Sequence, residues 1–199
     1  MSFWVSLVDA AAVLVIAKLL WIAVRVPVPV LRFGAERGSV SAQLALGNMF
    51  ASGKGAVQDY DEALRWFREA AEQGSTAAMD NIGVLYELGY GVEQDKAEAL
   101  RWYRMSAEHG GTDGMNSVGY AYLMGEGVDQ DEEEAVRWFR KSAELGNPMA
   151  QTNLALSYAT GQGIEKNRDE AVGWFMTAAK NGHKEALAAI EQLRNDGVL

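Results

Sequence analysis

A motif of 36 residues recurs in register along most of this chain. Its clearest marks are four tryptophans, each followed by an aromatic residue, at Trp66, Trp102, Trp138 and Trp174. A Gly-x-Gly turn also returns in every copy, first as Gly53 and Gly55 and last as Gly161 and Gly163. A gap-free repeat of this length predicts an array of similar units, each of which buries its apolar face against its neighbours.

Each unit contains the signals of two helices. The second helix opens with a capping box, in which Asp or Asn is followed three residues later by Glu, as in Asp95 and Glu98. An apolar stripe at i, i+3 and i+4 spacing then runs through the tryptophan, which predicts that the tryptophans belong to the core. The first helix begins near a Ser, Thr or Asn. Its central residues are predicted to be core: Leu46, Ile82, Val118, Leu154 and Ile190.

The pattern of small residues on the first helix, Gly-x-Gly in the turn and Ala-x-x-Trp on the second helix closely resembles the Sel1-like repeat, a relative of the tetratricopeptide repeat. The small residues are expected where neighbouring helices must approach closely, and they are Ala42, Ala78, Gly114, Ala150 and Ala186, followed by Gly47, Gly83, Gly119 and Ala155. The resemblance implies an all-α, right-handed helix-turn-helix solenoid over residues 35–199. We divide it into units 35–70, 71–106, 107–142 and 143–178, with a closing helix in 179–199.

The N-terminal segment is strongly apolar. Between Phe3 and Val24, only Ser6, Asp9 and Lys18 are not apolar. At about 1.5 Å per residue, a helix of this length spans the ~30 Å core of a bilayer. We therefore predict a single transmembrane helix within residues 1–25, followed by a stiff, extended, Pro-containing spacer over residues 26–34.

Two alternatives to a lipid-facing anchor stay open. The segment could be a docking helix buried in a membrane complex, with its polar residues Asp9 and Lys18 paired there. A cleaved signal peptide fits less well, because no basic residue precedes the apolar run. Basic residues gather on the C-terminal side of the segment, at Lys18, Arg25, Arg32 and Arg37.

The positive-inside rule then favours a cytoplasmic location for the repeats. We expect a single-pass protein of a bacterial inner membrane, with a periplasmic array as the alternative.

Charge and composition argue against several functions. The net charge is −9, and residues 1–34 contain only one acidic residue, so the acidic excess lies in the repeats and disfavours nucleic acid as a partner. The chain has no cysteine. Its two histidines, His109 and His183, are expected at the surface, and the run Glu132 to Glu134 is expected to be a solvated first helical turn. We therefore predict no enzymatic activity, cofactor, metal or small-molecule substrate.

Partner-binding residues are expected on the first helices, because in the resembling families these helices line a concave face that holds partner proteins. We selected first-helix positions that differ between units while the core stays fixed. The alternative is that such residues pack between successive first helices. The candidates are Met79, Asp80, Glu87, Met115, Asn116, Tyr120, Leu123, Gln151 and Thr152.

Together these features predict a membrane-anchored scaffold or adaptor for protein–protein interaction. Its partners would include an integral membrane protein or complex, of which the chain would be an accessory subunit. The alternative is an envelope-pathway regulator or enzyme-associated factor with a periplasmic repeat domain.

Overall fold

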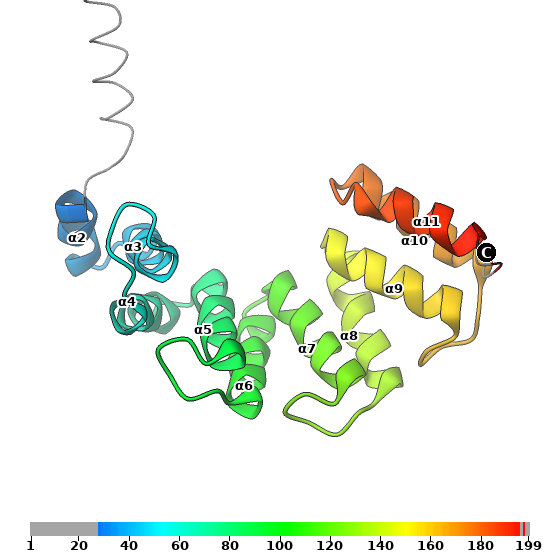
Figure 1. The fold of residues 1–199 in the computed structure, drawn as a ribbon, viewed down its shortest axis with the longest axis horizontal. Coiled ribbons are helices and arrows are strands. Elements are labelled where there is room, and N and C mark those ends of the chain that lie inside the picture. The colour runs from blue at the N-terminus through cyan, green and yellow to red at the C-terminus, as the bar shows by residue number, and fades with distance from the viewer. Residues whose placement is uncertain (1–27, 196, 198–199) are drawn as a thin grey trace, which may run out of the picture. The chain divides into compact units, whose positions relative to one another are not determined.

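The computed structural model describes residues 28–195 and residue 197. These residues form ten α-helices joined by short turns, which confirms the predicted all-α architecture (Figure 1). Eight of the ten helices have 13 residues, as expected for a strictly periodic chain. The helices are α2 (Val28–Glu36), α3 (Val40–Ser52), α4 (Tyr60–Glu72), α5 (Thr76–Leu88), α6 (Lys96–Glu108), α7 (Thr112–Met124), α8 (Glu132–Glu144), α9 (Pro148–Thr160), α10 (Arg168–Lys180) and α11 (Glu185–Asn195).

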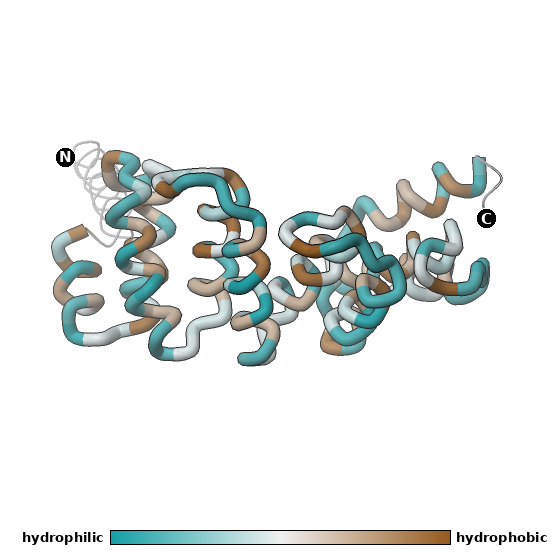
Figure 2. The backbone as a smooth tube through the Cα atoms, turned by 90° about the horizontal axis from the view of Figure 1, so that it is seen from below, coloured by the Kyte–Doolittle hydropathy of each residue, from teal (hydrophilic) through white to brown (hydrophobic). Residues whose placement is uncertain are grey.

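The chain divides into two compact units within α4. Unit 1 ends at Trp66, and unit 2 runs from Phe67 to Leu199. Within unit 2, each helix from α6 to α11 packs on the helix before it, and α5 also contacts α7. Every helix carries both hydrophobic and hydrophilic residues (Figure 2). This stacking of helix pairs is the solenoid arrangement that the repeat predicts.

The side-chain caps predicted at the helix starts are confirmed at α8 and α9. The side chain of Asp131 accepts a hydrogen bond from the backbone N–H of Glu134, and Asn147 accepts one from Ala150. The first helices end at glycines in the left-handed region, with φ of 71° at Gly89 and 70° at Gly125. Residues with a Cβ rarely adopt that conformation, so the turn requires glycine there.

The core follows the first helices as predicted, but it differs from the prediction on the second helices. Leu46, Ile82, Val118 and Leu154 are fully buried, and Ile190 is buried. Of the four tryptophans, only Trp66 is fully buried, whereas the other three are half-buried. The aromatic residue that follows each tryptophan is the core residue instead: Phe67, Tyr103, Phe139 and Phe175.

The small residues of the first helices make room for these rings. A Cβ built on Gly119 would lie 2.7 Å from Cδ1 of Phe139, closer than carbon atoms pack. Because Phe139 fills this space, α7 and α8 approach each other at the glycine. The prediction that small residues mark close helix approaches is therefore confirmed.

The predicted extended spacer is wrong for its described part. Residues 28–36 form helix α2, with Pro29 as its second residue. Proline is tolerated in the first turn of a helix, because the N–H that it lacks would have no helical partner there. Buried Gln43 donates from Nε2 to the carbonyl oxygen of Ala35 at 3.1 Å, which ties the end of α2 to α3.

The predicted membrane helix of residues 1–25, with Asp9 and Lys18, lies outside the described residues. Among the helices that the structure describes, none is both long enough and apolar enough to span a bilayer.

Candidate functional site

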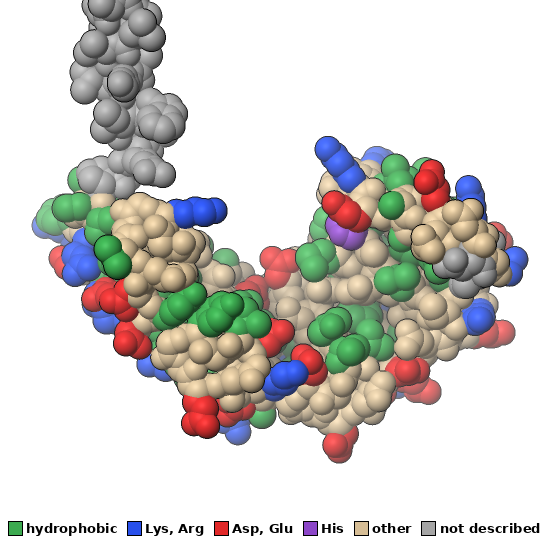
Figure 3. Space-filling model, viewed as in Figure 1, with side chains coloured by type: hydrophobic (Ala, Val, Ile, Leu, Met, Phe, Trp, Pro, Cys, Tyr) green, Lys and Arg blue, Asp and Glu red, His purple; other side chains and the backbone are tan. Residues whose placement is uncertain are grey.

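A pocket of about 320 Å³ opens on unit 2 where first helices α5, α7 and α9 come together with the start of α6. Most of its surface is apolar, with a floor formed by Ala99, Leu100 and Ala121. Hydrophobic side chains are exposed on this part of the molecule, with acidic side chains around them (Figure 3). The other lining residues are Glu87, Lys96, Tyr103, Asn116, Ser117, Tyr120, Glu126, Met149 and Asn153.

Two carboxylates of the pocket are held by neighbouring side chains. The hydroxyl of Tyr103 donates to Oε2 of Glu87 at 2.5 Å, and Nζ of Lys96 donates to Oε1 of Glu126 at 2.6 Å. Each bond uses one oxygen of its carboxylate. No group in the described part of the chain donates to the other oxygen. The two carboxylates are thus fixed in orientation and can still accept hydrogen bonds from a ligand.

The donors of these two bonds stay protonated at neutral pH. Burial, reinforced by the hydrogen bond to Glu87 and by its charge, raises the pKa of the Tyr103 hydroxyl well above its usual value. The hydrogen bond to Glu126 raises the pKa of Lys96. Tyr103 is therefore a permanent donor, and Lys96 is a permanent cation at the pocket rim.

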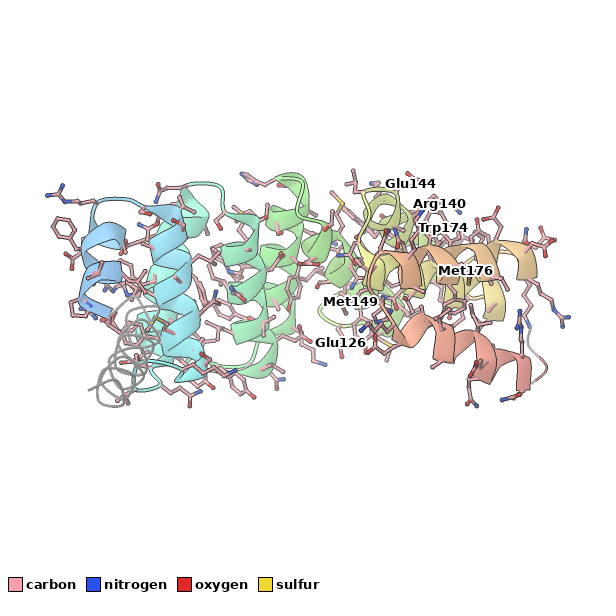
Figure 4. All side chains as sticks on the ribbon, turned by 90° about the horizontal axis from the view of Figure 1, so that it is seen from above. Glu126, Arg140, Glu144, Met149, Trp174 and Met176 are labelled. Carbon is pink, nitrogen blue, oxygen red and sulfur yellow. The ribbon has the colours of Figure 1, made fainter. Side chains whose placement is uncertain are left out.

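The rest of the rim combines amides with exposed apolar side chains. Nδ2 of Asn153 donates to Oδ1 of Asn116 at 2.9 Å, which links α9 to α7. The side chains of Tyr120 and Met149 are 45% and 56% exposed, so their apolar surface is available to a partner. Met149 and Glu126 lie close together in the side-chain view (Figure 4).

The structure brings together only some of the residues that the sequence selected. Glu87, Asn116 and Tyr120 line the pocket. Met79 and Gln151 are buried in the core, which corrects their selection as partner contacts. Gln151 is polar yet buried because its Nε2 donates to the Ala143 carbonyl and its Oε1 accepts from Asn181.

The remaining candidates are packed to different degrees. Leu123 is half-buried against the core between α8 and α9, and buried Thr152 bonds to His183. Both residues therefore pack within the array, which is the alternative to partner contact given above. Met115 and Asp80 are half-buried and do not line the pocket.

Asp80 has an unusual environment. Burial raises the pKa of its carboxyl to about 6, the nearby Ser106 hydroxyl acts in the opposite direction, and the negative charge of Asp113 raises it further. Yet Oδ1 of Asp80 and Oγ of Ser106 are both buried without a hydrogen-bond partner among the described residues. Gly114 packs directly on the two side chains, since a Cβ there would lie 2.8 Å from Oδ1 of Asp80.

Five lining residues that carry the pocket's chemistry or shape were not predicted from the sequence: Lys96, Tyr103, Glu126, Met149 and Asn153. A signal for one pair was present. Tyr103 stands where the other units have phenylalanine, and Glu87 stands where they have Ala51, Leu123 and Ala159. Both departures occur in the same unit, and the hydrogen bond joins them.

The two histidines differ in exposure. His109 is exposed as predicted, and its Nδ1 lies 2.9 Å from the carbonyl oxygen of Met105 at the end of α6. His183 is half-buried, with Nδ1 at 2.7 Å from Oγ1 of Thr152, so it is less exposed than predicted. The described residues contain no group of three or more His, Asp or Glu side chains placed to hold a metal ion.

A stack of uniform helix pairs with a pocket on its first helices defines a protein of the tandem helical repeat class. The model of the Sel1 repeat matches four segments: 40–75, 76–111, 112–147 and 148–183. The chain therefore belongs to the Sel1 repeat family. The matched segments have the expected length but begin five residues later than the units chosen from the sequence, because a periodic chain can be divided at any phase.

Solved structures with the same fold support this assignment. A Sel1 repeat protein from Oxalobacter formigenes is 36% identical, with a TM-score of 0.75 over 80% of this chain and 65% of the other. The protein c5321 from uropathogenic Escherichia coli, described as a protective antigen with an SLR fold, is 35% identical. Its TM-score is 0.78 over 87% of this chain and 37% of that chain. This chain thus spans less than two thirds of either protein.

Cysteine rich protein B of Helicobacter pylori is a more distant relative, 26% identical with a TM-score of 0.50 over 60% of this chain and 91% of the other. No curated protein matches the chain. Sel1-repeat proteins generally mediate protein–protein interactions, and their fold is typically a non-catalytic scaffold.

Proposed function

We propose that this protein is a membrane-anchored adaptor that binds a protein partner through the pocket on α5, α6, α7 and α9. The observation that carries the proposal is the pocket, in which exposed Tyr120 and Met149 stand beside two pre-oriented carboxylates. Aromatic and methionine side chains are enriched at protein interfaces, where they supply large contact areas. The acidic charge of the chain favours a protein over a nucleic acid as the partner.

The anchor is proposed from the sequence alone. The apolar run from Phe3 to Val24 is long enough to cross a bilayer, and the basic residues after it favour cytoplasmic repeats at a bacterial inner membrane. In this arrangement the adaptor serves as an accessory subunit, which holds its partner next to a membrane complex. Its role is binding, and it needs no catalytic group, cofactor or small-molecule substrate.

Site-specific photocrosslinking in cells tests the binding surface. A photoreactive phenylalanine analogue is placed at Tyr120 in the full-length chain, and a matched probe replaces Arg101, whose side chain is 77% exposed on α6 and does not line the pocket. We expect one defined protein to crosslink from position 120 and to be absent from position 101. Equal products from both positions, or none from position 120, would refute the proposed surface.

The location can be measured separately because the chain has no cysteine. A single cysteine replacing exposed Glu133 is treated with a membrane-impermeant maleimide in spheroplasts. Labelling only after the inner membrane is permeabilised supports cytoplasmic repeats. Labelling of intact spheroplasts supports a periplasmic array and the role of an envelope-pathway regulator, and recovery in the soluble fraction contradicts anchoring.

A further inference from the structure

The pocket belongs to one place in the array and is not a general feature of the repeat. The position of Tyr103 is occupied by phenylalanine in the other three units, and the position of Glu87 by alanine or leucine. The repeat fold is therefore built three times without this polar pair. Its presence in one unit, with both members facing one pocket, indicates a role other than folding.

The charges of the pocket are unbalanced. Glu87 and Glu126 line it with Lys96 as the only cation among its lining residues. The negative charges of Glu87, Asp80 and Glu126 also act on Tyr103, so all three lie near enough to contribute to the local potential. The pocket thus has a negative field above a mainly apolar floor, and both features point to a cationic ligand with an apolar stem.

An exposed tyrosine adds a flat surface to this site. The ring of Tyr120 lies on the pocket wall, and guanidinium groups stack on such rings. Elsewhere in this chain, Arg104 shows the same preference: its Nη2 donates to the hydroxyl of Tyr122 at 2.8 Å, and its guanidinium carbon is 5.6 Å from the centre of that ring. An arginine side chain uses every feature of the pocket at once.

We infer that the pocket binds an arginine side chain presented by an extended segment of the partner protein. Its methylene stem covers Ala99, Leu100 and Ala121, and its guanidinium donates to the free oxygens of Glu87 and Glu126. Tyr103 is a positioning residue, because it holds the Glu87 carboxylate towards the pocket. This inference rests on the proposed function, since it specifies the chemistry of the partner at the proposed surface.

A titration of the full-length, isotope-labelled chain in a neutral detergent tests the inference by NMR. The probes are three capped nine-residue peptides that are identical except for a central Arg, Leu or Glu. We expect the Arg peptide to shift the backbone amides of Glu87, Tyr120 and Glu126 and to bind at least tenfold more tightly than the Glu peptide. The Leu peptide should bind more weakly than the Arg peptide, because it fills the floor but leaves the carboxylates unpaired.

Variants taken from the other repeats keep the test clear of misfolding. Glu87→Ala copies Ala51 and should weaken the Arg peptide about tenfold, the size expected for one charge-assisted hydrogen bond. Tyr103→Phe copies Phe139 and should weaken it a few-fold while the Leu peptide is unaffected. Glu133→Ala makes the same change of net charge at an exposed position outside the pocket and should leave both affinities unchanged.

The outcomes separate this inference from the proposed function. If the Leu peptide binds in the pocket as tightly as the Arg peptide, the surface is a binding site but the arginine inference is wrong. If Glu87→Ala and Glu133→Ala weaken the Arg peptide equally, the attraction is a general charge effect and the inference is also wrong. If no peptide shifts the pocket amides, both the inference and the proposed surface are contradicted.

Discussion

Asp80 gives the sharpest prediction about stability, because the array contains its own control. In the next unit, Asn116 occupies the equivalent position on α7. The Asp80→Asn variant keeps the shape of the side chain but removes the charge that folding places in a partly buried site. We expect this variant to be more stable than the wild-type chain at neutral pH.

The magnitude follows from the pKa of the Asp80 carboxyl, which burial raises from 3.8 to about 6. At 1.36 kcal/mol per pKa unit, that difference corresponds to ~3 kcal/mol of lost stability when the carboxyl is ionised. Because Asp80 is only half-buried, solvent screening reduces this to roughly 1.5 kcal/mol. This is the free energy that the Asp80→Asn variant should recover at pH 7.

The pH dependence has a definite sign. A carboxyl whose pKa is higher in the folded state binds more protons there than in the unfolded state between pH 4 and 6, so the wild-type chain loses stability as the pH rises through that window. The advantage of Asp80→Asn should grow from near zero at pH 4 to its full value above pH 6. Below pH 4 the carboxyl is protonated in both states, and the two proteins should be equally stable on this account.

Urea denaturation followed by circular dichroism at several pH values between 4 and 7.5 measures this difference, with exposed Glu133→Gln as the control for net charge. A ¹³C titration of the Asp80 carboxyl by NMR gives its pKa directly. An Asp80→Asn variant no more stable than the wild type at pH 7, or with the same advantage at pH 4 as at pH 7, would refute this reasoning.

Three further predictions use the same stability measurement. Gly163→Ala should lower the free energy of unfolding by about 3 kcal/mol or more, because its φ is +66° and a Cβ would collide with the backbone of Glu132. The control is Gly182→Ala, which has open space around it. That variant should lose only the ~1–2 kcal/mol that the left-handed conformation costs a residue with a Cβ. Gly173→Arg should stabilise α10 by about 1 kcal/mol, since arginine has a higher helix propensity than glycine and can pair with Glu170 as Arg101 does with Glu98. The Gly173→Ala variant measures the contribution of helix propensity alone. A destabilised Arg variant would contradict the pairing. Arg140→Met should lower the free energy of unfolding by about 1 kcal/mol, because it removes the contact with Tyr158, whose hydroxyl accepts a hydrogen bond from Nη2 at 3.0 Å. An unchanged stability would show that this contact is energetically neutral.

The repeat made the fold predictable, because a residue pattern that recurs in four units distinguishes structural positions from the variation of any single helix. Leu46, Ile82, Val118 and Leu154 could be assigned to the core for this reason, and so could the glycines that end the first helices. On the second helices, the repeat alone does not identify the core residue. Trp102 and Phe139 each fit the apolar stripe of their own helix. Only the close helix approach at glycines such as Gly119 shows that the aromatic residue after the tryptophan, here Phe139, fills the core.

The spacer was mispredicted for a local reason. The proline rules disfavour helix before a proline, but they permit proline within a first turn, and nothing in Val28 to Val30 distinguishes the two cases. The buried hydrogen bond from Gln43 to Ala35 depends on a contact between two helices. Such a contact cannot be deduced from the spacing of residues within one helix.

The pocket was harder to predict than the core, because it arises from differences between units rather than from what they share. Variation at single first-helix positions selected Glu87 and Tyr120, which line the pocket, but it also selected Met79 and Gln151, which are buried in the core. A pair of departures that meet in space is more informative: Tyr103 and Glu87 depart from the other units together and form one hydrogen bond. A substitution between apolar core residues needs only to conserve volume. A tyrosine hydroxyl placed opposite a carboxylate instead adds a polar pair that the core does not require. In a repeat protein, such coupled departures are therefore the first positions to test for binding.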